Sequence, residues 1–213
     1  MSIITLVIVA ATCVLSFVSF SNQKLTEELI FYPPAISDRN QWYRFFTCGF
    51  IHADIPHLFF NMYSFYMFGD NIENMFEQLF GSKGKIIYLL LYVSSLFICL
   101  VPTYINHRHD YLYRSLGASG AVSAIVFAFI FLDPTAGIGL IFIPIHAPAF
   151  LFGIIYLVIS AILAQRGQSH INHSAHLWGA LYGIVFLIIT THFLSDYNVI
   201  DSFVIQVRAY LKM

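Results

Sequence analysis

Residues 116–132 read LGASGAVSAIVFAFIFL, an apolar run without a charge that opens with a serine flanked by glycines. A helix needs about 20 apolar residues to cross the hydrocarbon core, so this run is short for a full crossing. We expect a helix over Ser119 to Leu132 that starts inside the membrane, below its outer surface. In the whole chain 59% of residues are hydrophobic and 10% are charged, whereas about a quarter are charged in a soluble domain. The sequence therefore predicts an integral, multi-pass membrane protein.

Five further apolar stretches have the composition of membrane helices. They are Ile3–Phe20, Pro56–Phe76, Lys85–Tyr104, Pro148–Leu163 and Ser174–Phe193. The first lacks the basic start and the cleavage site of a signal peptide, so we interpret it as a retained span. The expected fold class is all-α: a six-transmembrane-helix bundle over residues 1–195, followed by a polar to weakly amphipathic tail over residues 196–213.

Charge and cysteine content exclude other classes of protein. The net charge of −1 provides no basic surface for nucleic acid. The three cysteines follow no metal-ligand spacing, and an odd number gives no disulfide framework. Lys and Arg divide six to four between the loops of the two sides, so the positive-inside rule does not fix the orientation.

Ser119 is a candidate nucleophile because of its neighbours and its place at the start of a helix. Gly117 and Gly120 have no side chains, so other backbones can approach the serine closely. The first N–H groups of a helix have no partners within it, and the helix dipole favours negative charge there. Small residues also let membrane helices pack, so the same motif fits a purely structural role.

His176 is a candidate general base on the last predicted span. It shares one helix face with Gly179 and Gly183, which form a GxxxG pair that permits close helix contact. If this face packs against the small residues around Ser119, a neutral imidazole reaches the hydroxyl. A histidine bonded to a backbone carbonyl is an alternative, and so is a metal site, because His170 and His173 precede His176 at intervals of three.

His57 and Asn61 lie four residues apart on the second predicted span, so one side chain lies above the other. Two N–H donors at this spacing can converge on one oxygen, as the tetrahedral intermediate of acyl transfer requires. The alternative is that Asn61 only joins neighbouring helices through a hydrogen bond.

Together these motifs resemble the rhomboid family of intramembrane serine proteases. The family pattern has His-x-x-x-Asn, Gly-x-Ser-Gly and Ala-His-x-x-Gly-x-x-x-Gly on its second, fourth and sixth helices. Here the three motifs occur in that order, and they contain His57 and Asn61, then Gly117, Ser119 and Gly120, then Ala175, His176, Gly179 and Gly183.

The resemblance implies a serine endopeptidase that cleaves transmembrane segments of membrane proteins with a Ser119–His176 dyad. The oxyanion would bind the Ser119 N–H, His57 and Asn61. No cofactor and no metal are expected; the partners would be transmembrane substrates and the lipid bilayer, with no nucleic acid. The minimal six-helix form is typical of prokaryotes and therefore implies the cell membrane of a prokaryote.

Two residues outside the motifs also match the family. Arg44, with Trp42 before it, resembles the Trp-Arg motif of the partly embedded first loop, although Tyr43 separates the two residues here. Glu73 resembles a structural carboxylate that binds this loop.

One departure concerns the residue one turn after Ser119. Many bacterial members have a tyrosine there that stacks on the catalytic histidine, whereas this chain has Ser123. The orientation of His176 must then come from elsewhere. One alternative function is an inactive rhomboid-like protein that binds membrane clients, although such relatives typically lack the serine or the histidine. The other alternative is a transporter or channel lined by His176 and Asn61. The predicted spans four to six contain no acidic residue and the sequence has no internal repeat, and both observations disfavour this function.

Overall fold

The computed structural model describes residues 2–139, 146–166 and 171–212, and these residues are mostly helical. Each predicted apolar stretch contains a helix, and two of these helices begin and end where the sequence predicts. The long helices are α1 (Ile3–Phe20), α5 (Ile55–Phe80), α6 (Gly84–Ile98), α8 (Ser119–Leu132), α9 (Ala149–Arg166) and α10 (His173–Leu194).

Short elements connect the long helices. The first loop, residues 21–54, contains α2 (Gln23–Leu29), α3 (Pro33–Arg39), α4 (Arg44–Thr47) and η1 (Cys48–Phe50). The others are η2 (Gly81–Lys83), α7 (Val101–His107), α11 (Val199–Leu211) and an antiparallel pair of strands, β1 (Gly137–Gly139) and β2 (His146–Pro148). The all-α prediction did not include this pair.

The third predicted span, Lys85–Tyr104, is not one helix. The chain leaves the helix at Cys99 and Leu100, and α7 begins with Pro102 in its first turn. Proline has no N–H and its ring clashes with the carbonyl of the preceding turn, so it interrupts a helix but fits at a helix start.

Apolar surface and helix length identify a membrane protein. Four stretches of the described chain are long and apolar enough to cross a membrane, namely Ile3–Phe20, Ile55–His107, Ala149–Arg166 and His173–Leu194, and α8 is a shorter apolar helix. Large apolar side chains point outward; Val14, Ile86 and Val158 are 63%, 63% and 53% exposed. So much exposed apolar surface requires lipid around it. The chain is an integral, multi-pass membrane protein.

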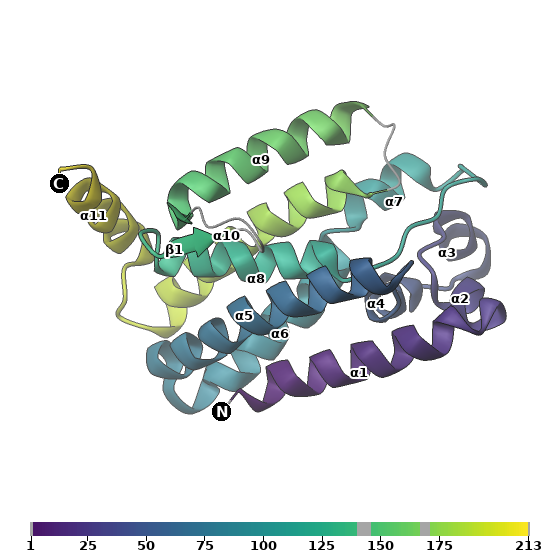
Figure 1. Cartoon of the computed structure of the whole chain (residues 1–213), viewed down its shortest axis with the longest axis horizontal. Helices are drawn as coiled ribbons and strands as arrows, with labels where there is room; N and C mark the ends of the chain where they lie inside the picture. The colour runs from purple at the N-terminus through teal and green to yellow at the C-terminus, as the bar shows by residue number, and fades with distance from the viewer. Residues whose placement is uncertain (1, 140–145, 167–170, 213) are drawn as a thin grey trace.

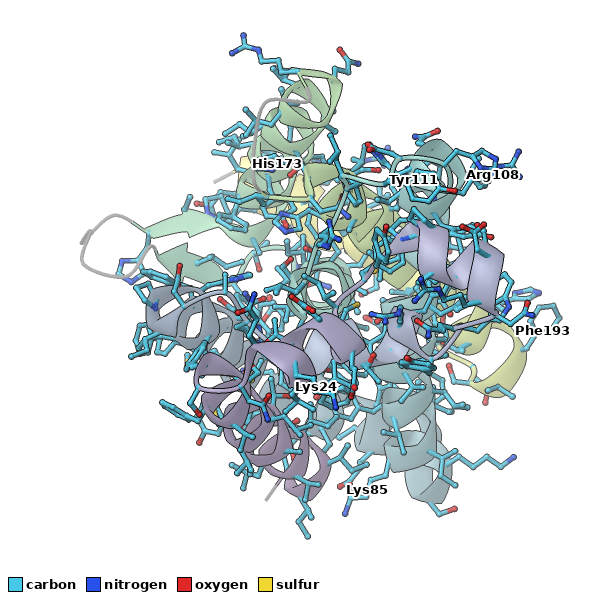
Figure 2. All side chains as sticks on the ribbon, turned by 90° about the vertical axis from the view of Figure 1, so that its right-hand side faces the viewer. Lys24, Lys85, Arg108, Tyr111, His173 and Phe193 are labelled. Atoms are coloured by element: carbon cyan, nitrogen blue, oxygen red, sulfur yellow. The ribbon has the colours of Figure 1, made fainter. Side chains whose placement is uncertain are left out.

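Helix α8 lies in the middle of the bundle, with α9 on one side and α5, α6 and α1 on the other (Figure 1). Twelve of its fourteen residues are buried, as expected for a helix that is apolar on every face. Helices α8 and α10 start at the same end of the bundle, beside the first loop and α7 (Figure 1). Figure 2 views the molecule from that end, where Arg108 and Tyr111 follow α7.

Helices α8 and α10 meet at the predicted glycines. A Cβ atom on Gly179 would overlap the carbonyl group of Gly120, and one on Gly183 would overlap that of Ala124. The GxxxG pair therefore lets the two backbones touch. This contact brings the N-terminal ends of both helices together.

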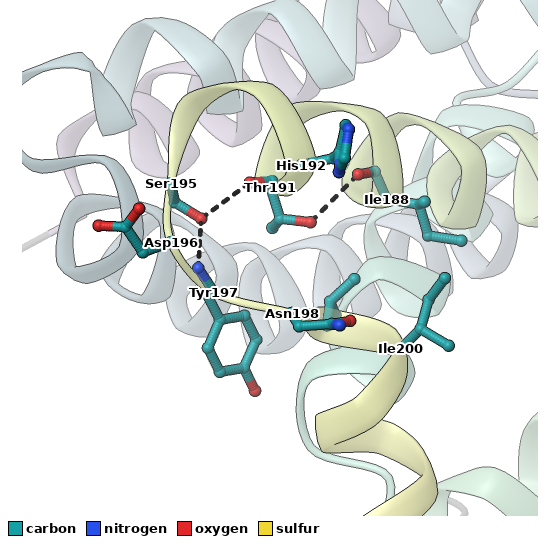
Figure 3. Close-up of a pocket in the computed structure, with 9 residues that line it drawn as sticks. Ile188, Thr191, His192, Ser195, Asp196, Tyr197, Asn198 and Ile200 are labelled. Carbon is teal, nitrogen blue, oxygen red and sulfur yellow. Dashed lines mark hydrogen bonds between the residues drawn. The ribbon is translucent and has the colours of Figure 1, made fainter.

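Helix α11, within the predicted tail, covers the other end of α8. The Gln206 side chain donates a hydrogen bond to the Leu132 carbonyl, and the ring of Phe203 stacks on that of Phe131. The last carbonyls of a helix have no partner within it, so α11 satisfies one of them. The turn between α10 and α11 borders a cavity of about 290 Å³, lined by residues that include His192 and Ser195 (Figure 3).

Glu73 binds α1, so the expectation that it binds the first loop was wrong. Its carboxylate accepts hydrogen bonds from the N–H groups of Ile4 and Thr5 and from the Thr5 hydroxyl, which also contacts the Tyr88 hydroxyl at 2.7 Å. The first N–H groups of a helix lack partners and attract negative charge. Glu73, which is 1% exposed, therefore fixes the start of α1 against α5.

Candidate active site

Ser119 and His176 are in direct contact, although 57 residues separate them in the sequence. The His176 Nε2 atom lies 2.6 Å from the Ser119 Oγ atom, which is hydrogen-bond distance. Ser119 is the first residue of α8, and His176 lies in the first turn of α10. The Asn172 side chain caps α10 by accepting from the Ala175 N–H, and it also pairs with Thr103 of α7.

Hydrogen bonds join the turn before α8 to the first loop. Gly117 has a φ of +111°, a conformation that other residues rarely adopt. Its N–H donates to the Cys48 carbonyl at 2.9 Å, and the N–H of Ala118 donates to the His52 Nε2 atom at 3.4 Å. Phe31 and Ser115 exchange backbone hydrogen bonds farther out. The first loop therefore sets the position from which Ser119 enters α8.

His52 is a site residue to which the sequence analysis gave no role. Because its Nε2 atom accepts from Ala118, its Nδ1 atom carries the proton and donates to the Ser16 hydroxyl at 3.0 Å. Ser16 in turn donates to the Phe50 carbonyl at 3.1 Å. Burial, with a smaller contribution from the nearby His57, lowers the pKa of His52 to about 3. A neutral imidazole of fixed tautomer thus joins α1, the first loop and the turn before Ser119.

His57 and Asn61 lie beside the pair. Asp54 caps α5 by accepting from the His57 N–H at 2.7 Å, which places His57 in the first turn. Its ring lies where a Gly117 side chain would be: a Cβ atom there would be 2.7 Å from His57 Cε1. Asn61 donates to the His57 carbonyl at 3.0 Å, which leaves its amide a second N–H.

The four predicted site residues line one cavity of about 550 Å³. The cavity walls include Ser119, His176, His57 and Asn61 together with residues of the first loop and of the turn before α8. Ser119 opens α8, and the N–H groups of the first turn of a helix have no partners within it. This arrangement can bring a carbonyl to the serine hydroxyl and surround its oxygen with N–H donors.

Ser123 has a hydrogen-bond partner from another helix. Its hydroxyl contacts the Tyr156 hydroxyl of α9 at 2.6 Å and the Ser119 carbonyl at 2.8 Å. The Tyr156 ring lies nearly parallel to the His176 ring, with centroids 6.4 Å apart and an angle of 20° between planes. An aromatic ring therefore accompanies His176 although position 123 is a serine. No local sequence pattern pointed to Tyr156.

Arg44 is outside the cavity and holds the first loop together. It is 6% exposed, and its Nη1 atom donates to the carbonyls of Glu27 and Ile30 at 2.8 Å each. Its Nε atom donates to the Gln41 side chain at 2.6 Å. Buried guanidinium groups need several acceptors, and these backbone carbonyls provide them.

The residues described contain no cluster of three His, Cys, Asp or Glu side chains able to hold a metal ion. The ring of His173 meets that of His176 edge to face, with centroids 5.6 Å apart. His170, which the metal alternative also needs, lies outside the described residues.

Comparison with known proteins identifies the family. The model of the Rhomboid domain matches residues 39–193, which include Ser119, His176, His57 and Asn61. The chain belongs to the rhomboid family. This family consists generally of intramembrane serine proteases.

Similar rhomboid proteins come from plants, bacteria and animals. RHOMBOID-like protein 12, mitochondrial, of Arabidopsis thaliana is 36% identical over 63% of this chain and 42% of its own length. A candidate rhomboid protease of Bacillus subtilis, YdcA, is 33% identical over 68% of this chain and 65% of its own. The bovine presenilin-associated rhomboid-like protein, mitochondrial, is 31% identical over 65% of this chain and 35% of its own. The chain thus matches less than two thirds of each relative.

Proposed function

We propose that this rhomboid protein is an intramembrane serine endopeptidase that cleaves transmembrane segments of other membrane proteins. The observation that carries the proposal is the 2.6 Å contact between Ser119 Oγ and His176 Nε2 at the wall of a cavity. A separation too large for a hydrogen bond, without a cavity, would have favoured a client-binding protein. The similar bacterial protein YdcA, whose name contains rhomboid protease, adds support.

In the proposed reaction Ser119 is the nucleophile and His176 the general base. The Ser119 Oγ atom attacks the scissile carbonyl carbon while His176 Nε2 takes the hydroxyl proton. His176 then gives this proton to the amide nitrogen, and the C–N bond breaks. Water attacks the resulting ester with the help of His176 and regenerates the free serine. The chain needs no metal or organic cofactor for these steps.

The negative oxygen of the tetrahedral intermediate would lie among the Ser119 N–H, the His57 ring and the Asn61 amide. The start of α8 contributes its dipole, which favours negative charge at that point. Donors fixed before the reaction are worth more in a site that excludes bulk water, because they need no reorganisation. The hydrogen-bond chain through His52 keeps the turn before Ser119 in place for this purpose.

The substrate class follows from where the pair lies. Ser119 starts a helix of 14 residues, shorter than a full crossing, in a bundle with six proposed spans: α1, α5, α6, α8, α9 and α10. A peptide bond within a helix must be unwound before attack, and unpaired backbone groups are costly in lipid. We therefore infer substrates with helix-weakening residues near one membrane surface. The proposed location is the cell membrane of a prokaryote; relatives named as mitochondrial make an organelle membrane the other outcome.

The test is cleavage of a generic single-pass membrane substrate by the purified protein. Ser119→Ala and His176→Ala should each lower the rate at least about 1,000-fold, because the two residues act as a unit. Ser195→Ala and His192→Ala are matched controls, since both residues lie at the opposite end of α10. These controls should cleave like the wild type. Cleavage that survives Ser119→Ala would overturn the assignment, and no cleavage by any form across several substrates would favour a client-binding protein.

A further inference from the structure

Tyr156 lies where three helices meet beside the proposed dyad. It belongs to α9, and its half-buried side chain reaches Ser123 of α8 and the ring of His176 on α10. Its hydroxyl is joined to the hydroxyl of Ser123 at 2.6 Å. Ser123, which is 4% exposed, is in turn anchored on the carbonyl of Ser119, the nucleophile itself. The tyrosine therefore has a fixed position relative to both members of the dyad.

The proposed dyad lacks an acidic third residue, so packing has to orient the imidazole. Among the residues described, the rings close to His176 are those of Tyr156, nearly parallel at 6.4 Å, and of His173, edge to face at 5.6 Å. A ring that lies parallel to the imidazole opposes rotation of the imidazole plane. That rotation would turn Nε2 away from Ser119 and break the 2.6 Å contact.

This inference rests on the proposed function. We propose that Tyr156 is a positioning residue that holds His176 toward Ser119, and that the Ser123 hydroxyl anchors Tyr156. The ring is supplied by α9, in which three of eighteen residues are buried, rather than by the enclosed α8. Tyr156 also lines a second cavity of about 310 Å³, together with Phe60 of α5, Phe152 of α9 and both members of the dyad. A displacement of α9 would therefore move the ring that aligns the base.

The test compares kcat and KM of four variants on a transmembrane substrate. Tyr156→Leu removes the ring and should lower kcat about 10- to 100-fold, the effect expected for misplacing a reacting group by about 1 Å, with KM within about twofold. Tyr156→Phe keeps the ring and should restore most of kcat. Ser123→Ala should match Tyr156→Phe, and the double variant should be no worse than either, because both remove the same hydrogen bond.

Tyr182→Phe is the matched control. The Tyr182 hydroxyl donates to Ser94 at 2.7 Å between α10 and α6, so this variant also breaks a partly buried Tyr–Ser hydrogen bond. Because Tyr182 is not among the residues that contact the dyad, its loss should leave kcat and KM unchanged.

Three outcomes overturn the proposal. The first is a kcat of Tyr156→Leu within about twofold of the Tyr182→Phe control, and the second is a rise in KM alone, which indicates lost substrate binding. The third outcome applies if Tyr156→Leu does not fold. In that case the proposal fails if the effects of Ser123→Ala and Tyr156→Phe on kcat add up in the double variant, because the effects of coupled partners are not additive. If one of these outcomes occurs while the wild type and the Tyr182→Phe control cleave the substrate, only the role of Tyr156 is contradicted. If neither protein cleaves it, the proposed function is contradicted as well.

Discussion

At both ends of α10 a histidine and a serine lie next to a cavity, yet only at its start are the two side chains in direct contact. At the start of α10, His176 meets Ser119 at 2.6 Å beside the cavity of about 550 Å³. At its other end, Ser195 donates to the Thr191 carbonyl and accepts from the Tyr197 N–H, while His192 is exposed (Figure 3). We propose that histidine and serine serve a reaction at the start of α10, whereas Ser195 caps a turn at the other end.

Helix polarity explains much of this difference. The Ser119 end gathers the first turns of α5, α8 and α10, whose dipoles favour a negative oxygen, and of these three helices α8 has no side-chain cap on its first N–H groups. The Ser195 end offers carbonyl oxygens, which disfavour it, and the Ser195 hydroxyl is already used in capping. Residue type alone does not define a candidate site; the direction of the helices that carry the residues does.

Separating α8 from α10 should have the largest effect on the difference between the two ends of α10, because it pulls Ser119 away from His176. Gly179→Ala places a Cβ atom on the Gly120 carbonyl, so the helices must move apart. Overpacking of this kind costs about 1–3 kcal/mol or more in free energy of unfolding. We expect the cleavage rate to fall at least about 100-fold, because the dyad loses its alignment.

Thermal unfolding and cleavage assays on the same preparation measure both effects of Gly179→Ala. Gly137→Ala is the control, since a Cβ atom there would lie 3.8 Å from the Cβ atom of His146, an ordinary van der Waals distance. Wild-type activity in Gly179→Ala would show that close contact of α8 and α10 is not needed.

A second prediction concerns His57 and Asn61, the proposed oxyanion donors at the Ser119 end of α10. Asn61→Ala and His57→Ala should each lower kcat by about 100-fold, as the loss of one oxyanion donor does elsewhere. KM should change little, because the charge on the oxygen exists only in the transition state. Steady-state kinetics in detergent check this. A rise in KM with unchanged kcat would instead assign these residues to substrate binding.

The smallest predicted effect comes from His52, which supports the turn before Ser119. His52→Leu removes the acceptor of the Ala118 N–H, and a buried N–H without a partner costs about 1–3 kcal/mol. We expect a lower unfolding temperature and about a tenfold lower kcat. Since the pKa of His52 is about 3, its protonation should not affect activity above pH 5. If His52→Leu leaves both the unfolding temperature and kcat unchanged, His52 does not support the turn before Ser119.

The sequence predicted the parts of the site that depend on local spacing. Ser119 and His176 were predicted because each lies among small residues at helical intervals, and their contact and the packing of Gly179 and Gly183 against α8 agree with the predicted proximity. The helix positions also followed from apolar runs, although α5 and α9 extend to Phe80 and Arg166, beyond their predicted ends, and one predicted span became two helices at Pro102.

Residues that act across helices were harder to predict. Tyr156 belongs to α9 and His52 to the first loop, and no local pattern shows which helix either will face. The partner of Glu73 was assigned wrongly for the same reason: its carboxylate binds Thr5, 68 residues away. The departure at Ser123 was the useful signal, because a small polar residue left room for a ring from elsewhere.

The most direct test of the account is the reactivity of its serines toward a fluorophosphonate, a probe that modifies activated serine hydroxyls, with the modified peptide identified by mass spectrometry. The account predicts an adduct on Ser119 in the wild type, no adduct on Ser195, and no adduct on Ser119 in His176→Ala. An adduct on another serine, or equal modification of Ser119 with and without His176, would contradict it.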